Sequence, residues 1–198
     1  MAYITRDQVK ETMDITGSAQ NDLIDRLIPW AKSVIDSYTG RDFDSLGSST
    51  KVLTGTGTEV MALPDLQSLT SINMRDFPDE AFESVNTGDI FLEPGDKGAT
   101  LPYTWMQVYP VNGTRTIFPG SMQSVQVVGV WGWPSVPTDI TEAAATLIAR
   151  QMKAGRSGFT DTVGTTQTGI VRVSTGMPDL VEQVLNSYLL RDVIAIHA

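Results

Sequence analysis

The pattern of apolar and polar positions divides the chain into three stretches. Before residue 50, and again after Pro134, apolar residues recur every three or four positions, as they do on one face of a helix. From Lys51 to Trp131 the period changes to two, and Gly, Thr, Pro and Asn interrupt it, which is typical of short strands. The pattern therefore predicts an α+β protein with a mostly antiparallel β domain inserted between helices.

The helical stretches predict a helical bundle of three to four helices. A short helix over 5–15 begins at Thr5 as N-cap, and a longer one over 18–38 ends at Gly40 as C-terminal cap. After the β domain, a third helix opens at Thr138 or Asp139 and stops at Gly155, and a last one has Pro178 in its first turn. The predicted division of the chain is 1–49 for the N-terminal helices, 50–133 for the inserted β domain, and 134–198 for the C-terminal helices, a long loop and a tail.

Within the β domain the alternation predicts seven strands. Asn112-Gly113 lies between the fifth and the sixth predicted strand and is a strong signal for a tight hairpin turn. The predicted strands cover 51–54, 59–63, 69–74, 89–92, 105–109, 115–118 and 124–130.

Composition restricts the class of function. With 198 residues, 41% of them hydrophobic, the chain is long enough for one sizeable core. A net charge of -9 argues against binding nucleic acid through neutralised phosphates. The chain contains no cysteine and no apolar run of about 20 residues, so neither disulfides nor a membrane span is expected, and a reducing cytoplasm is the expected compartment.

Catalysis is not expected either. The only histidine is His197, so one chain cannot build a Ser-His-Asp triad or a multi-histidine metal site, and no metal or cofactor is predicted. Carboxylates alone could act in glycoside hydrolysis, but a solvated acidic loop is the favoured interpretation of the four in question. They are Asp76, Asp79, Glu80 and Glu83.

Aromatic and basic residues each leave two interpretations open. Trp105, Trp131 and Trp133, together with Tyr103 and Tyr109, could form a sugar-stacking platform, although a β-domain core and a helix–sheet joint are favoured. The cations near the end of the third helix interact favourably with its C-terminal dipole, and the alternative is a position facing a DNA channel. These cations are Arg150, Lys153 and Arg156.

Two segments favour partner chains. The loop over 157–176 is rich in Gly and Thr, and its few apolar side chains cannot offset the entropy of ordering it, so a partner is expected to hold it. The apolar tail Val193, Ile194, Ala195 and Ile196 follows Arg191 and is of the kind that docks into a neighbour by strand addition or by filling a groove.

Two distant segments, taken together, resemble a known family. The first is residues 35–43, ending in Tyr38-Thr39-Gly40-Arg41-Asp42-Phe43, and the second is residues 127–134, followed by Pro137-Thr138-Asp139-Ile140. With the strand signature around Gly55, Gly57, Leu63 and Pro64 between them, they are similar to the head-tail connector (adaptor, or head completion) proteins of long-tailed double-stranded DNA bacteriophages.

This resemblance implies a structural virion protein without enzymatic activity or cofactor. Such proteins form a ring, usually twelvefold, beneath the portal protein, extend the DNA channel and offer a platform to a stopper, tail terminator or tail. DNA passes through without specific binding. The expected location is the head-tail interface of the virion, and the host cytoplasm during assembly. The β domain is larger than in all-helical members, so its partner, the major capsid protein among the candidates, does not carry over.

The resemblance also assigns residues to interfaces. It implies portal contacts in the C-terminal helix and tail, through Tyr188, Arg191, Val193, Ile194 and Ile196. It implies subunit contacts in the long loop, through Phe159, Ile170, Val171, Arg172 and Val173. Two alternatives stay open: a carbohydrate- or receptor-binding β module of a phage particle, and a tail-completion protein.

Overall fold

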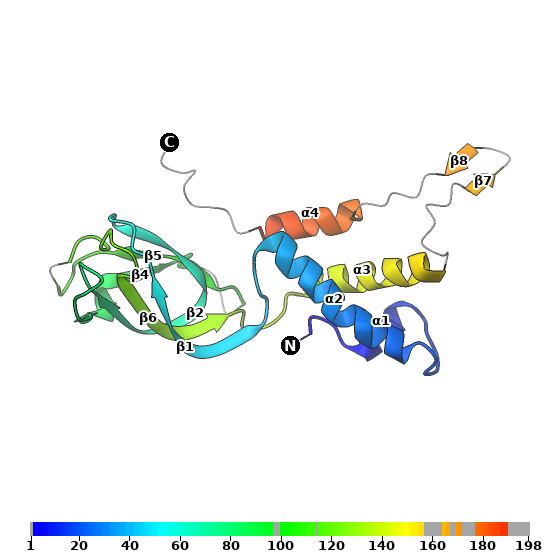
Figure 1. Ribbon diagram of the computed structural model, residues 1–198, viewed down its shortest axis with the longest axis horizontal. Coiled ribbons are helices and arrows are strands. Elements are labelled where there is room, and N and C mark those ends of the chain that lie inside the picture. Colours follow the sequence, from blue (N-terminus) through cyan, green and yellow to red (C-terminus); the bar gives the residue numbers. More distant parts are fainter. Residues whose placement is uncertain are drawn as a thin grey trace. The chain divides into compact units, whose positions relative to one another are not determined.

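The computed structural model describes residues 2–96, 100–113, 115–156, 164–166, 169–171 and 177–189 (Figure 1). At Arg156 and in the two three-residue ranges, only the backbone is described. The described residues fall into two compact units. The helical unit consists of the described parts of Met1–Arg41 and Val136–Asp192, and the β unit consists of those of Asp42–Ser135.

The helical unit contains four helices and a small hairpin among its described residues. Strands β7 (Gly164–Thr166) and β8 (Gly169–Val171) pair antiparallel and form the hairpin. The helices are α1 (Arg6–Thr12), α2 (Asn21–Thr39), α3 (Thr138–Arg156) and α4 (Asp179–Ser187).

The predicted caps of the first two helices are confirmed. Thr5 is the N-cap of α1, and it forms a capping box with Gln8: the Thr5 amide donates to Gln8 Oε1 at 2.8 Å and the Gln8 amide to Thr5 Oγ1 at 3.3 Å. Gly40 ends α2 in the left-handed conformation, φ 69°, and its amide donates to the Asp36 carbonyl at 2.9 Å. Helix α3 runs one residue beyond its predicted stop at Gly155.

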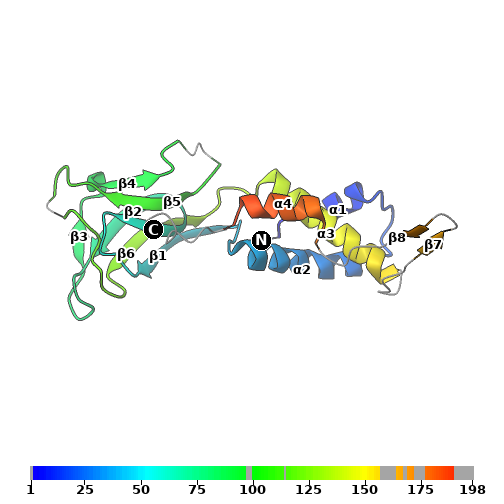
Figure 2. The ribbon, with the colours of Figure 1, turned by 90° about the horizontal axis from the view of Figure 1, so that it is seen from above.

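The four helices lie side by side (Figure 2), and their apolar faces are buried. Helix α3 contacts α1, α2 and α4, and α2 also contacts α1 and α4. The three-to-four spacing of apolar residues in the sequence therefore marks the faces that are buried, as expected for amphipathic helices. The buried side chains include Val9, Ile24, Leu27, Ala31, Ile35, Ile140, Ala144, Leu147, Ile148, Met152, Val181 and Leu185.

The β unit is a single six-stranded antiparallel sheet. Five strands follow the order β1-β6-β2-β5-β4, and β3 pairs with the C-terminal end of β2. Together with the helices, this sheet confirms the predicted α+β class. The strands are β1 (Ser45–Leu53), β2 (Val60–Met74), β3 (Glu83–Val85), β4 (Ile90–Glu93), β5 (Tyr103–Val108) and β6 (Val125–Gly132), and the 3-10 turn η1 (Thr87–Asp89) precedes β4.

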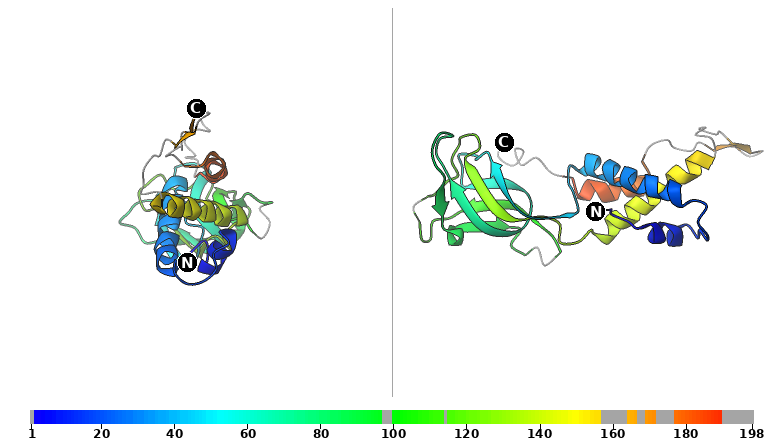
Figure 3. Two further views of the ribbon diagram at one scale, coloured as in Figure 1. Left: turned by 90° about the vertical axis from the view of Figure 1, so that its right-hand side faces the viewer. Right: turned by 60° about the horizontal axis from the view of Figure 1, so that its bottom comes forward.

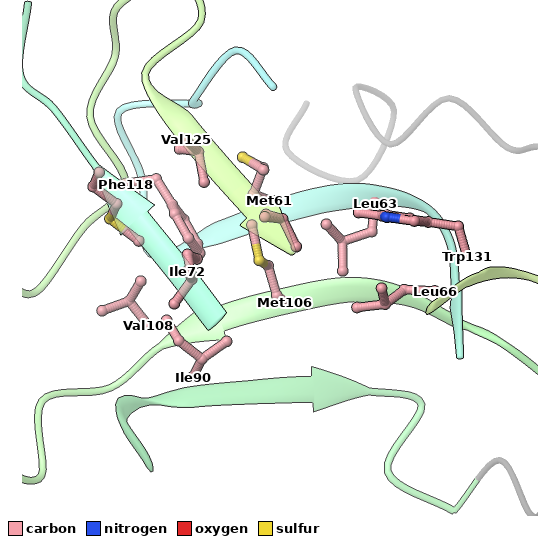
Figure 4. Packing of buried hydrophobic residues seen from close by; sticks show 12 residues of the cluster. Met61, Leu63, Leu66, Ile72, Ile90, Met106, Val108, Phe118, Val125 and Trp131 are labelled. Carbon is pink, nitrogen blue, oxygen red and sulfur yellow. The ribbon is translucent and has the colours of Figure 1, made fainter. Parts of the chain in front are cut away.

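The sheet is curved (Figure 3, right), and one cluster of apolar side chains forms its core. Met61, Met106 and Ile72 point toward one another near its centre, and Phe118 reaches the core from a loop (Figure 4). Burial of each such side chain stabilises the fold by about 1.5 to 3 kcal/mol. None of the described helices is long and apolar enough to cross a membrane.

Two of the predicted strands are parts of a single strand. The predicted strands 59–63 and 69–74 both fall in the long strand β2, which begins at Val60. Its partner changes along its length, because Val60, Met61 and Ala62 pair only with β5, whereas pairing with β6 starts at Leu66. Pro64 lies in the irregularity between the two pairings, where the missing amide costs no ladder hydrogen bond. The short polar strand β3 was not predicted.

The predicted strand 115–118 and the predicted hairpin turn are absent from the described residues. Residues 115–118 are not in a strand, and Phe118 is attached to the sheet by its amide, which donates to the Thr58 carbonyl at 2.8 Å. The amides of Val111 and Asn112 donate to the buried carboxylate of Asp89 at 3.0 and 2.7 Å. A Cβ on Gly113 would lie 2.7 Å from the same carboxylate. The backbone around the Asn-Gly pair therefore binds the Asp89 carboxylate and does not form a hairpin turn.

Candidate interaction sites

The ends of the two segments that carry the family resemblance meet in the β unit, where the chain enters and leaves it. Ser45 of β1 pairs with Gly132 of β6, and the Trp133 amide donates to the Asp44 carbonyl at 3.1 Å. The rings of Phe43 and Trp133 pack with their centroids 5.1 Å apart. We call this arrangement the joint, and its residues are Phe43, Asp44, Asp65, Gly132 and Trp133.

The joint requires glycine and tryptophan at these positions. Gly132 has φ 81°, and a Cβ there would lie 2.1 Å from the Asp44 carbonyl oxygen. The indole Nε1 of Trp133 donates to the Asp65 carboxylate at 2.9 Å, and both residues are buried. The neighbouring Trp131 is fully buried in the sheet core, and its Nε1 donates to the Ser49 carbonyl at 2.9 Å.

The alternative interpretation, a sugar-stacking platform, is not available to two of its five residues. Trp131 and Trp133 are buried, as the favoured interpretation expected. Trp105 is half-buried on β5, Tyr103 is half-buried and packs against the apolar core, and Tyr109, after the end of β5, is 60% exposed. Tyr109 meets Phe91 edge-to-face at 81°, so these rings do not form one flat surface for a sugar.

The C-terminal helix is attached to the helical unit by two tyrosines. The Tyr38 hydroxyl of α2 donates to Asn186 at 2.8 Å. The Tyr188 hydroxyl donates to the carboxylate of Asp139 at the start of α3, at 2.8 and 2.9 Å. Burial, followed by this hydrogen bond to an anion, raises the pKa of Tyr188 to about 12. The hydroxyl of Tyr188 is thus engaged within the subunit.

The predicted portal and subunit contacts fall mainly outside the described residues. Of the portal set, Arg191, Val193, Ile194 and Ile196 lie outside them, and only Tyr188 is placed. Of the subunit set, Phe159, Arg172 and Val173 lie outside them, and Ile170 and Val171 are placed by their backbone in β8. Both assignments stay predictions.

The basic residues of α3 occupy its last two turns. Arg150 is half-buried, Lys153 is exposed, and Arg156 is the final residue of the helix. Their position agrees with a favourable interaction with the negative end of the helix dipole. The alternative position facing DNA stays a prediction.

The four candidate carboxylates are exposed, and at least one of them is paired. Asp76 accepts from Arg115 Nη1 at 2.8 Å, and this hydrogen bond lowers the pKa of the Asp76 carboxyl. A general acid needs a raised pKa, so the environment of Asp76 is opposite to the one that the general acid of glycoside hydrolysis requires. Among the described residues, no group of three His, Cys, Asp or Glu side chains is arranged to hold a metal ion.

Negative charge is concentrated in the β unit. Residues 42–135 carry 11 of the chain's 23 acidic residues but only 4 of its 14 basic ones. The rest of the sequence is closer to electrical balance. A surface of this kind repels phosphate backbones and attracts basic partners.

Sequence reasoning missed the loops at the far end of the sheet. Arg75 and Arg115 join residues 75–83 to residues 115–123 through hydrogen bonds, and Phe77 and Met122 project from the two loops. The signal that was present is Phe77-Pro78-Asp79-Glu80, in which Pro occupies the second position of a β-turn. The Glu80 amide donates to the Phe77 carbonyl at 3.1 Å and closes that turn.

No protein-family model and no curated protein matches the chain. Among solved structures, the chain is similar to one in "Neck of empty GTA particle computed with C6 symmetry", with 18% identity and a TM-score of 0.47, over 86% of this chain and 92% of that chain. It is also similar to one in "Virion of native gene transfer agent (GTA) particle", with 17% identity and a TM-score of 0.42, over 82% of this chain and 84% of that chain.

Proposed function

We propose that this chain is a structural neck protein of a tailed, phage-like particle, and specifically a head-tail adaptor. Copies of it form a ring under the portal protein, extend the DNA channel and provide the attachment platform for a stopper or the tail. The observation that carries the proposal is the joint. The two segments over 35–43 and 127–134 resemble the same family, and Phe43 of one and Trp133 of the other, 90 residues apart in the sequence, pack together in one buried structure.

The order of the elements supports the same assignment. Helices α1 and α2 precede the sheet and α3 and α4 follow it, as in a helical body with an inserted β domain. Tyr38 and Tyr188 attach α4 to its neighbours, so the residues after it leave from a fixed helix. An apolar tail on a fixed base is suited to seating a subunit on a larger protein.

The negative charge of the chain also agrees with a role in lining or extending a DNA channel. DNA slides along a wall that does not neutralise its phosphates, whereas dense Lys and Arg would hold it. The net charge of -9 and the acidic β unit agree with passage of DNA without specific binding. The role needs no enzymatic activity and no cofactor.

Two alternatives make different predictions. A carbohydrate- or receptor-binding β module would bind glycans through Trp105, but burial of Trp131 and Trp133 and the perpendicular Phe91–Tyr109 pair disfavour it. A tail-completion protein belongs to the same particle and differs in its neighbour, because it would bind the tail and not the portal.

The test is a binding experiment with the portal protein of the same genome. In the test variant Val193, Ile194 and Ile196 are replaced by Ser in the full-length chain. In the matched control the exposed apolar residues Leu46 and Val52 of β1 are replaced by Ser.

The proposal predicts that the wild-type chain and the control variant bind the portal protein and that the tail variant does not. Particles assembled with the tail variant should show defects in their DNA-filled heads. Portal binding that survives the tail substitutions, or binding to the tail with none to the portal, would contradict it.

A further inference from the structure

One end of the β unit lies far from the points where the chain enters and leaves it. Strand β6 runs from Val125, opposite Leu53 and Met74, to Gly132 in the joint. Its 8 residues span about 26 Å, so the loops beyond Val125 and Met74 lie a full strand length from the joint. We call this end the tip, and it consists of residues 75–83 and 115–123.

Hydrogen bonds hold the two loops of the tip together at three places. Arg75 Nε donates to the Gln123 carbonyl at 3.1 Å, and Ser121 Oγ donates to the Asp76 carbonyl at 2.7 Å. The third is the ion pair between Arg115 and Asp76, at 2.8 Å. The loops are therefore a fixed surface.

Local backbone structure fixes the tip further. The Phe77 amide donates to Glu80 Oε2 at 3.2 Å, within the turn that the Glu80 amide closes. Gln123 holds a left-handed φ of 53°, which a residue with a side chain adopts rarely.

This fixed surface presents large apolar side chains to solvent. Phe77 is 61% exposed, Met122 72% and Ile117 46%. The contacts of Asp76 with Ser121 and Arg115 bring the backbones of all three residues to the same end of the sheet. Isolated exposed apolar residues are common on proteins, but a group of them on a rigid surface marks an interface.

The charge around the group indicates what kind of partner it fits. The arginines of the two loops are engaged within the tip: Arg75 lies 4.5 Å over the Phe82 ring, and Arg115 pairs with Asp76 at 2.8 Å and with Glu83 at 3.6 Å. Asp79, Glu80 and Glu83 are exposed on the first of the two loops. With Asp76, the tip carries four carboxylates and two arginines, so its net charge is negative.

We propose that the tip is a docking surface for a different protein, whose face presents an apolar socket edged by Lys and Arg. A second copy of this chain is the poorer fit, because its β unit carries the same excess of negative charge and like charges oppose association. The inference goes beyond the neck role proposed above, because it assigns a partner to the β unit whether or not the C-terminal tail binds the portal.

The test places the photo-crosslinking residue p-benzoylphenylalanine at position 77 of the full-length chain. The chain is co-expressed with the structural proteins of its own genome, and the crosslinked residues are mapped by mass spectrometry. The matched control carries the same residue at position 109, because Tyr109 is 60% exposed where Phe77 is 61% exposed. Two further variants carry the crosslinking residue at position 77 together with a charge reversal. The test variant has Asp79→Lys, and the control variant has Asp96→Lys.

The proposal predicts a crosslink from position 77 to another polypeptide, at a site flanked by Lys or Arg, with a higher yield than from position 109. Asp79→Lys should lower that yield by at least about threefold, and Asp96→Lys should leave it unchanged. Crosslinks only to a second copy, a site without basic residues, or equal effects of the two Lys substitutions would each overturn the proposal. Portal binding is measured separately, so its failure does not affect this result.

Discussion

Substitution of Gly132 by alanine tests the joint, because two separate constraints require glycine there. The residue has φ 81°, and an added Cβ would lie 2.1 Å from the Asp44 carbonyl oxygen. That oxygen accepts the Trp133 amide at 3.1 Å, so it cannot move away without lengthening this hydrogen bond. We therefore expect Gly132→Ala to weaken the whole joint.

Gly47→Ala provides the matched control that separates the two constraints. Gly47 has φ 71° and nothing within 4 Å of an added Cβ. Its substitution should cost only the left-handed conformation, about 1 to 2 kcal/mol. Gly132→Ala bears the same conformational cost, and loss of the buried hydrogen bond adds about 1 to 3 kcal/mol.

The assay is urea denaturation of the full-length chain followed by tryptophan fluorescence. Three of the four tryptophans, Trp105, Trp131 and Trp133, lie in the β unit, and the variants carry Trp30→Phe so that the signal reports that unit. We expect the free energy of unfolding to fall by at least about 1 kcal/mol more for Gly132→Ala than for Gly47→Ala. Equal losses for the two variants would refute the reasoning, because the close approach to Asp44 would then have no energetic consequence.

Three further predictions concern hydrogen-bonded carboxylates. Tyr188→Phe should lower the free energy of unfolding by about 1 kcal/mol, a value reduced for partial exposure. The pKa of Tyr188 is raised from 10.0 to about 12, so its contribution to stability is complete below pH 10 and is lost as the pH rises toward about 12. The free energies of unfolding of wild type and variant should therefore converge near pH 12, and a difference that stays constant with pH would contradict this. Asp89→Ala should speed amide exchange at Val111 and Asn112 and cost about 1 to 3 kcal/mol, whereas the exposed Asp96→Ala should change neither. Arg115→Met should return the lowered pKa of the Asp76 carboxyl toward its ordinary value in an NMR titration, and an unchanged pKa would mean that Arg115 is not its cause.

Much of the helical unit could be predicted from local signals. Thr5 and Gly40 act within one turn of their own positions, so the sequence is sufficient to place them as caps. The apolar faces of α2 and α3 follow from spacing alone because these helices bury one side each.

The β unit was harder to predict because its strands depend on partners distant in sequence. Pro64 divides the apolar pattern of β2, yet the strand continues because it changes partner from β5 to β6 at that point. Asn112-Gly113 carries the local signature of a hairpin, but the buried carboxylate of Asp89 binds its backbone instead. Such contacts have no local sequence signal.

In the candidate sites, too, local features could be predicted and contacts between distant residues could not. The burial of Trp131 and Trp133 followed from their place at the end of a strand, whereas the role of Trp133 required knowledge of Asp65, 68 residues away. The tip went unpredicted because Phe77 and Met122 lie on different loops, which only the contacts of Arg75, Arg115 and Ser121 bring together.

Electron microscopy of the full-length chain co-purified with the portal protein of its own genome decides whether the chain is a head-tail adaptor. An adaptor is expected as a closed ring bound coaxially to the portal, with density for the C-terminal tail on the portal surface. Complexes in which the chain is absent from the portal, or in which it remains a monomer at saturating portal concentration, would rule the adaptor role out.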